Sequence, residues 1–392
     1  MTLQEVLRAK AHAIAPRLTE LRRHLHANPE LSLKEYRTAT FVAEHLRSLG
    51  LEPVIVAGGT GVCAVVEGSR PGARTVALRA DMDALPIQET TGLPYASRNS
   101  GVMHACGHDG HTANLLGAAE LLLAAREHFA GRVKLIFQPA EEVLAGAKRM
   151  IEEGALENPR VDAIFALHAW PKLAVGTIAH RSGPALAASN AFTIIVTGCG
   201  THAAYPERGR NPISALARLV HDLEVIPATR LGVGAPSVVS VAGFSSGSRA
   251  VNVIPESGTI IGTFRTLSET ARAMVREEVL ARTRAIECLG YTARVDFSEG
   301  CPVTVNHPSL DRLVARAIPA QLGSERFASL SETTMGAEDF AYYGARVPSC
   351  FLRLGVGERL SLHHPGFDFN DEALPSGMQA FARLAIEFLA EG

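Results

Sequence analysis

Side chains that can bind metals gather in the segment MHACGHDGH, which spans residues 103–111. Thiol, imidazole and carboxylate groups together suit a borderline divalent cation, Zn²⁺ first and also Mn²⁺, Co²⁺ or Ni²⁺. Further candidate ligands lie far along the chain. The candidate ligands are the Cys-x-His pair Cys106 and His108, the adjacent Glu141 and Glu142, His168, and the adjacent His363 and His364.

These candidate ligands exceed one tetrahedral shell, so the sequence predicts a site for two metals that clamp an attacking water and a developing oxyanion. The two adjacent glutamates can divide the work, because one can bind metal while the other acts as general base. Taken singly, each group also has an ordinary explanation, such as a solvated loop or a hydrogen-bonded histidine. Their shared placement at strand ends favours a metal-dependent hydrolase.

Apolar strands must bring these groups together. The stretches RTVALRADMDALPI, RVKLIFQPAEE, VDAIFALHAWP and SCFLRLGVGERLSLHHPGFD each read as an apolar strand that ends in polar residues. In open α/β sheets ligands bind just outside the carboxyl ends of the strands. The polar groups predicted at or just past these ends are Asp81, Asp83, Glu141, Glu142 and His168.

The order of elements predicts an α/β fold with an insertion. Continuous apolar strands that alternate with helices indicate a mostly parallel sheet with helices on both faces. Between about residues 190 and 298 the order changes to βαββαβ, a ferredoxin-like pattern. A chain of 392 residues is too long for one core. We therefore expect a catalytic domain in two parts, 1–187 and 299–392, interrupted by a smaller domain over 188–298.

The composition and charge of the chain exclude some classes of partner and indicate a cellular location. The net charge is −2 and no long Lys/Arg run occurs, which argues against nucleic acid or an anionic membrane as the main partner. No apolar run reaches the roughly 18 residues of a membrane span, and the N-terminus has no signal-peptide core. The six cysteines show no framework spacing, so we expect reduced thiols and a cytoplasmic protein.

Several long motifs resemble the M20 metallopeptidase family. They are RADMDALPI, MHACGHDGHTANLLGAA, FQPAEE, LHAWP, GTFRT, GAEDFAYY and LHHPGFD, and they follow the family order over nearly the whole chain. The resemblance is greatest to the amidohydrolase branch, with its hippurate, N-acyl-amino-acid and indole-3-acetyl-amino-acid hydrolases. It implies cleavage of N-acyl amino acids to a carboxylic acid and a free amino acid. It also implies two divalent ions per subunit, Mn²⁺ or Zn²⁺, with Co²⁺ or Ni²⁺ possible.

The resemblance also implies roles for single residues. Glu141 takes the position of the general base, and His363 is preferred over His364 because the family pattern is Leu-His-x-Pro. Asp81-Met82-Asp83 stands where many M20 peptidases have His-x-Asp, so Asp83 is expected to orient a ligand. The alternative for both aspartates is a simple helix or turn cap. The implied metal ligands are Cys106, His108, Glu142, His168 and His363.

The other polar residues of segment 103–111 and those of the GAEDF motif are not expected to bind metal. The resemblance does not make His104 or His111 ligands. Asp109 is expected to satisfy amides at the start of the following helix, which we place from Thr112 onward. Glu338 and Asp339 are expected to shape the floor of the site.

The inserted block resembles the family's satellite domain, which acts as a lid and mediates dimerisation, so a homodimer is expected and a tetramer is possible. His202 is the candidate to stabilise the oxyanion, within or across subunits. Cys199 replaces the family's usual lysine in that loop. Asn252 and Arg265 are candidates to bind the substrate carboxylate, and the alternative for Arg265 is a strand-surface ion pair.

Three alternatives stay open at this point. The first is a dipeptidase or aminoacyl peptidase of the same family, which needs a pocket for a free α-amino group. The second is a hydrolase with Cys106 as its nucleophile, which would be insensitive to chelators. The third is a non-catalytic metal-binding or scaffold protein, which predicts a lost base or ligand, and every expected position is filled.

Overall fold

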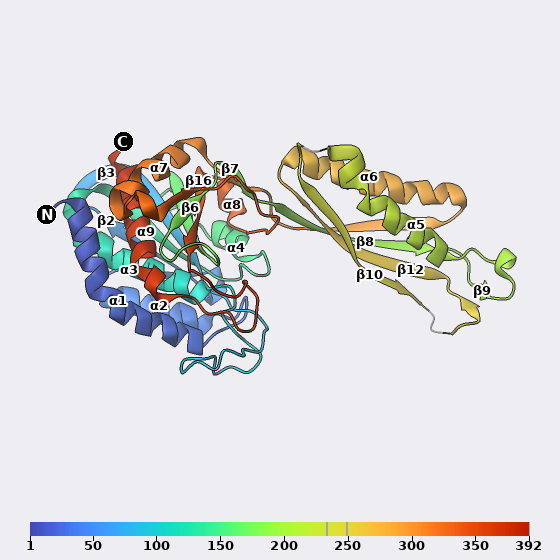
Figure 1. The fold of residues 1–392 in the computed structure, drawn as a ribbon, viewed down its shortest axis with the longest axis horizontal. Coiled ribbons are helices and arrows are strands. Elements are labelled where there is room, and N and C mark those ends of the chain that lie inside the picture. Colours follow the sequence, from blue (N-terminus) through green and yellow to red (C-terminus); the bar gives the residue numbers. More distant parts are fainter. Residues whose placement is uncertain (233, 248–249, 392) are drawn as a thin grey trace. The chain divides into compact units, whose positions relative to one another are not determined.

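The computed structural model describes residues 1–232, 234–247 and 250–391, which form two compact units. The larger unit comprises residues 1–185, 305–332 and 339–392, and the smaller unit comprises residues 186–304 and 333–338. Figure 1 shows that helices and strands alternate through the larger unit, whereas one strand-rich block makes up the smaller unit.

The larger unit is built on one eight-stranded sheet (Figure 1). Its four central strands, β4, β3, β5 and β16, are parallel to one another, and antiparallel neighbours flank them on both sides. The predicted mostly parallel sheet is therefore confirmed. In spatial order the strands are β1 (Val54–Val56), β2 (Gly61–Glu67), β4 (Ala130–Gln138), β3 (Arg70–Asp81), β5 (Ala163–Trp170), β16 (Ser349–Gly355), β6 (Ile178–His180) and β15 (Phe327–Ser329).

Helices cover both faces of this sheet, as the side chains of β3 show. Leu78 and Ala80 join the core formed with α1, α3 and α9. Arg79 points to the opposite face, where it meets Asp339 and Phe340 beside α8. Successive residues of a strand face opposite sides, so both faces are covered by protein. The helices of the larger unit are α1 (Leu3–Ala27), α2 (Tyr36–Ser48), α3 (His108–Ala124), α4 (Gly146–Glu152), α7 (Pro308–Leu322), α8 (Ala341–Gly344) and α9 (Leu374–Ala390).

The smaller unit has the predicted ferredoxin-like arrangement. Its chain order is βαββαβ, and its four-stranded antiparallel sheet has the spatial order β10-β12-β8-β13. Apolar side chains of one sheet face and of both helices form a separate core. The elements in chain order are β8 (Ala188–Thr197), α5 (Pro212–Glu224), β10 (Ser237–Ser246), β12 (Ser257–Thr266), α6 (Glu269–Ala285) and β13 (Thr292–Glu299).

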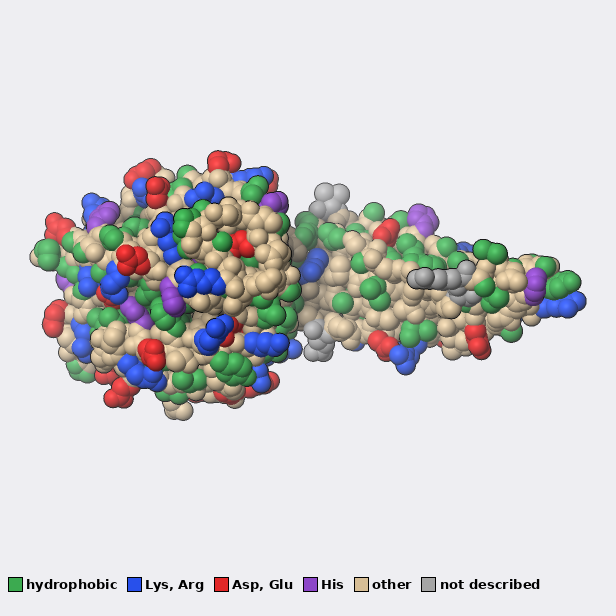
Figure 2. Space-filling model, turned by 90° about the horizontal axis from the view of Figure 1, so that it is seen from below, with side chains coloured by type: hydrophobic (Ala, Val, Ile, Leu, Met, Phe, Trp, Pro, Cys, Tyr) green, Lys and Arg blue, Asp and Glu red, His purple; other side chains and the backbone are tan. Residues whose placement is uncertain are grey.

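Short strands complete the two units, and the surface of the larger unit carries both acidic and basic side chains. The short strands are β7 (Gly183–Leu186), β9 (Thr201–His202), β11 (Val253–Ile254) and β14 (Thr304–Asn306). In Figure 2, acidic and basic side chains intermingle over the visible face of the larger unit, and its described residues form no broad basic area there. None of the helices in the described ranges has the length and apolar composition needed to cross a membrane.

Helix α3 depends on a glycine where it passes the ring of Phe369. A Cβ atom at Gly110 would lie 2.4 Å from Cδ2 of that buried ring. We expect Gly110→Ala to destabilise the larger unit by about 1–3 kcal/mol, because the packed ring cannot move without disturbing its neighbours. Gly117→Ala in the same helix is the control, since its closest contact is the flexible Met378 Sδ at 3.0 Å. Urea unfolding followed by Trp170 fluorescence measures both, and equal stabilities would contradict the prediction.

Candidate metal centre

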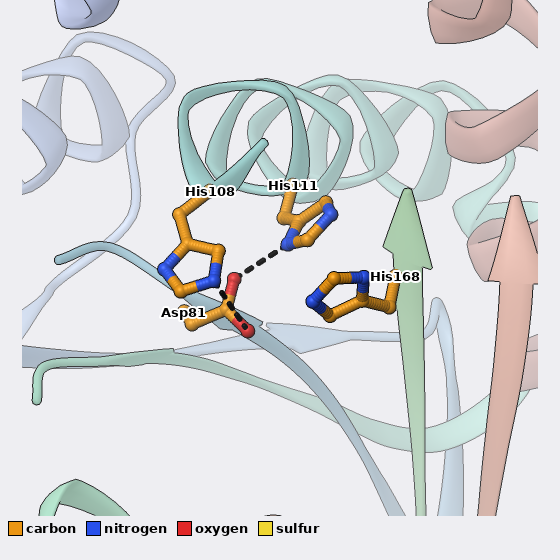
Figure 3. Close-up of side chains that lie close together, drawn as sticks. All are labelled: Asp81, His108, His111 and His168. Atoms are coloured by element: carbon orange, nitrogen blue, oxygen red, sulfur yellow. Dashed lines mark hydrogen bonds and ion pairs between the residues drawn. The ribbon is translucent and has the colours of Figure 1, made fainter. Parts of the chain in front are cut away.

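The predicted strand ends do converge. Strand β3 ends at Asp81, β5 carries His168 near its end, and α3 begins beside them. Figure 3 shows His108 and His111 on the first turn of α3, with both rings turned toward Asp81 and with His168 approaching from β5. The helix starts already at His108 and not at Thr112, so His108 belongs to the first turn and not to the preceding loop.

His108 presents one unoccupied ring nitrogen to the site. Its Nδ1 lies 2.9 Å from the carbonyl oxygen of Asp83, and a carbonyl only accepts, so Nδ1 carries the proton. Its Nε2 is buried without a hydrogen-bond partner among the described residues. The same Nε2 lies 3.8 Å from a carboxylate oxygen of Asp81 and 3.8 Å from Oε1 of Glu142. A ring nitrogen that faces carboxylates in this way holds a proton in the metal-free protein, and its lone pair becomes a ligand when a metal cation replaces that proton.

Cys106 and His168 meet on the other side of the site. The Sγ of Cys106 lies 3.6 Å from Nε2 of His168, and Nδ1 of His168 donates to the carbonyl oxygen of Ala169 at 2.9 Å. Nε2 of His168 therefore also presents a lone pair. Burial, followed by the charges of Glu142 and Glu141, raises the pKa of the Cys106 thiol well above its usual range. Only a bound cation would make this thiol a thiolate at neutral pH.

Glu142 links the two groups of candidate ligands. It shares one group with Cys106 and His363, and a second group with His108 and Glu141, with all ligand atoms of each group within 4.8 Å of one another. Its Oε2 lies 3.5 Å from Nε2 of His363, and its buried Oε1 has no hydrogen-bond partner among the described residues. The backbone amide of His363 donates to the carbonyl oxygen of Ala105, and this bond joins the loop that carries His363 to segment 103–111. The donor types and the unsatisfied atoms fit divalent cations.

His111 lies in the cluster of Figure 3, but its two nitrogens are already used. Nδ1 donates to Oδ1 of Asp81 at 2.6 Å, and Nε2 accepts the backbone amide of Ala169 at 2.7 Å. His111 therefore ties the end of β3 to the end of β5, on either side of the site. Arg79 occupies the other oxygen of Asp81 at 2.7 Å. Asp81 is thus bound by two side chains, although a His-x-Asp motif would place a ligand here.

Asp83 is held by three separate contacts. Its Oδ2 accepts from the Ser32 hydroxyl at 2.7 Å and from the Glu142 amide at 3.0 Å, while Oδ1 lies 3.2 Å from Nδ1 of His108. Burial raises the pKa of Asp83, but these hydrogen bonds and the charge of His108 outweigh it, so the pKa is lowered. Asp83 therefore fixes the ring of His108 and the backbone of Glu142 together.

The expected cap by Asp109 is not present. The residue before α3, Gly107, makes no side-chain cap, and Asp109 is buried in an ion pair with Arg22 at 3.0 Å and a contact with His26 at 2.8 Å. Asp109 thus binds α3 to α1. Arg22 and His26 were missed because the stretch LRRHLHA reads as the polar face of an ordinary amphipathic helix.

The GAEDF motif lies partly beneath the metal centre. Asp339 is buried, and it accepts hydrogen bonds from Arg79 at 3.1 Å, from Gln138 at 2.7 Å and from the Ala147 amide at 2.8 Å. These bonds connect β3, β4 and α4 behind the site. Glu338 belongs to the smaller unit. Arg79 and Gln138 lie within the motifs RADMDALPI and FQPAEE, but neither motif assigned them a role, because their contacts with Asp339 appear only in the folded chain.

The remaining predicted site residues lie in the smaller unit. His202 and Asn252 line one open cavity of about 600 Å³ on that unit. The Nδ1 of His202 accepts the amide of Ala204 at 3.0 Å, so its proton is on the outward Nε2. Arg265 is half-buried on β12 and forms no ion pair with the residues that the structure describes, so the alternative of a strand-surface ion pair has no support there.

The sequence comparisons identify the family. The family model of peptidase family M20/M25/M40 matches residues 77–387. The chain belongs to this family. It is 38% identical to N-acetylcysteine deacetylase of Bacillus subtilis, over 95% of this chain and 97% of the relative. It is 37% identical to IAA-amino acid hydrolase ILR1-like 2 of Arabidopsis thaliana, over 98% of this chain and 88% of that relative.

A solved structure agrees with this assignment. The YXEP protein of Bacillus subtilis, described as a dinuclear metal-binding peptidase of the M20 family, matches with a TM-score of 0.85 and 35% identity. The match covers 97% of this chain and 99% of that one. The prediction of a metal-dependent hydrolase of the M20 family is confirmed.

Binding of divalent metal should release protons. Without metal the pKa of His108 is about 10, because Asp81, Asp83 and Glu142 outweigh its burial, and the pKa of Cys106 is higher than its usual value. Both groups are thus protonated at pH 7 to 8 and must lose their protons to bind metal, so affinity should rise with pH across this range. Calorimetry with Zn²⁺ in buffers of different ionisation enthalpy counts the released protons. Cys106→Ala should release fewer, and equal release by both proteins would contradict the assignment.

Proposed function

We propose that the protein is an amidohydrolase that cleaves N-acyl amino acids, hippurate-like compounds among them, with two divalent cations per subunit. The observation that carries the proposal is the position of Glu142 in both ligand groups, with Glu141 directly beside it. A carboxylate shared in this way suits two cations, Mn²⁺ or Zn²⁺, and Co²⁺ or Ni²⁺ are possible. The names of the deacetylase and the IAA-amino acid hydrolase support the substrate class, and the dinuclear relative supports the number of cations.

We assign the five candidate ligands and one base as follows. The cations, when bound, activate the attacking water and stabilise negative charge on the carbonyl oxygen. Glu141 accepts the proton of the water and returns it to the leaving amine, which leaves a carboxylic acid and a free amino acid. Asp83 keeps Nε2 of His108 directed into the site. The hydrogen bond from the His363 amide to the Ala105 carbonyl oxygen fixes the backbone of His363. The proposed ligands are Cys106, His108, Glu142, His168 and His363.

The smaller unit supplies the proposed substrate contacts. His202 carries its proton on the outward Nε2, so it can donate to the substrate carbonyl oxygen as that atom gains charge. Arg265 has no competing ion pair with a described residue, and its fork can bind the substrate carboxylate together with Asn252. We propose that residues 188–298, which make up most of this unit, form the satellite domain that pairs the protein as a homodimer. We also propose a cytoplasmic location, because Cys106 must stay reduced to bind metal.

The site offers little support for a nucleophilic Cys106. A nucleophilic cysteine needs a depressed pKa, whereas burial and neighbouring carboxylates raise the pKa of this thiol. His168 cannot act as its base while Nε2 also serves a cation. The filled set of ligands and the adjacent Glu141 likewise favour an enzyme over a scaffold.

A substrate panel tests the proposal. Protein loaded with Mn²⁺ or Zn²⁺ should hydrolyse hippurate or other N-acyl amino acids, and a chelator should abolish the activity because the ligand atoms then lose their cation. Unblocked dipeptides form the second arm. Cleavage of dipeptides without cleavage of acyl amino acids would favour the dipeptidase, and chelator-resistant activity that iodoacetamide abolishes would favour Cys106 as nucleophile.

The base assignment has its own variant. Glu141→Gln keeps the size of the side chain but removes its proton acceptor, so kcat should fall by at least about 10²- to 10⁴-fold. Metal content, measured by mass spectrometry, should stay near that of the wild type. Glu152→Gln on the exposed side of α4 is the matched control and should leave kcat unchanged. Near-normal turnover by Glu141→Gln would show that another group is the base.

A further inference from the structure

A buried arginine beside the metal centre has no acidic partner among the described residues. Arg353 lies on β16, is only 7% exposed, and forms no ion pair within the described ranges. Its guanidinium makes one long hydrogen bond, from Nη2 to the carbonyl oxygen of Ala185 at 3.4 Å. Buried arginines are normally paired, because an isolated charge is costly to remove from water. Arg353 therefore has donors left over for an anion.

A second guanidinium adds to the positive charge. Burial, followed by the charge of Arg181, lowers the pKa of Arg353 to about 10. Nη1 of Arg181 donates to the carbonyl oxygens of Ser182 and Pro184, whereas its buried Nε has no partner among the described residues. Two neighbouring cations repel each other, and an anion between them would relieve the repulsion. Arginine forks match the two oxygens of a carboxylate.

Arg353 lies on the side of the sheet that carries the metal centre. Arg353 pairs in register with His168 across the parallel strands β16 and β5, so both side chains leave the same face of the sheet. The Cζ atom of Arg353 lies 4.0 Å from the ring centroid of Trp170, and that ring lies 6.2 Å from the ring of His168. Trp170 thus stands next to both the guanidinium and a proposed metal ligand.

We propose that Arg353 and Arg181 bind a second carboxylate of the substrate and so select N-acyl amino acids that carry an additional acid. This inference rests on the proposed function, in which Arg265 already binds the α-carboxylate. The additional carboxylate can come from the amino-acid side chain or from the far end of a dicarboxylic acyl group. Stacking on Trp170 holds the plane of the Arg353 guanidinium, which prepares its fork for one orientation of the anion.

Four substrates distinguish the two sources. N-acetylglutamate carries the acid on the side chain, and N-acetylglutamine is its neutral partner. N-succinyl-leucine carries the acid on the acyl group, and N-succinamyl-leucine is its neutral partner. In at least one pair the wild type should prefer the acid, and Arg353→Met should lower kcat/KM for that acid by about 10- to 100-fold, mainly through KM. Both neutral partners should keep their kcat/KM values, and Arg353→Lys should retain part of the preference because it keeps the charge.

The outcomes separate this inference from the proposed function. If the wild type hydrolyses none of the four compounds, nor hippurate, the proposed function fails. If it hydrolyses the neutral compounds but prefers neither acid, or if Arg353→Met affects acids and neutral partners equally, only the second carboxylate site is wrong. Arg353→Gln is the second variant should the Met variant unfold, and thermal melting of the metal-loaded protein verifies the fold.

Discussion

The metal centre is shaped by an excess of buried negative charge. Asp81, Asp83 and Glu141 are buried around this site, together with the largely buried Glu142. One buried arginine, Arg79, forms an ion pair with Asp81. Carboxylates packed this closely repel each other unless protons or cations lie among them. In the metal-free protein the raised pKa of His108 meets part of this demand with a proton. Divalent cations would meet it more fully, which explains why the donor set and the electrostatics lead to the same conclusion.

Support for the ligands comes from hydrogen bonds that fix their backbones and rings. His111 joins the ends of β3 and β5, while Asp83 joins the loop after β3 to the segment after β4. Behind them, the buried pair of Arg22 and Asp109 binds α1 to the first turn of α3, which carries His108. Ligands held by such outer contacts lose little entropy when a cation binds. The fold therefore contributes to metal affinity well beyond the ligating atoms.

The sequence predicted the parts of this arrangement that depend on local pattern. Apolar strands followed by polar residues gave the parallel sheet and the edge at which Asp81 and His168 meet, and the βαββαβ order gave the ferredoxin-like unit. The start of α3 and the partners of Asp109 could not be predicted in this way. The partners of Asp109 are Arg22 and His26 of α1, and an amphipathic pattern does not distinguish such tertiary contacts from surface residues.

The role of Arg353 could not be predicted from the sequence either, and its position bears on substrate specificity. In the stretch SCFLRLG one arginine interrupts an apolar strand, and the sequence alone gives no reason to separate it from a charge at a sheet edge. The structure places it in the interior beside Trp170, with no ion pair to any residue that the structure describes, where a cation is costly. An anion bound there would offset this cost. Since Arg265 of the smaller unit is proposed for the α-carboxylate, an additional acid on the substrate is the chemical feature that best accounts for a second arginine at this position.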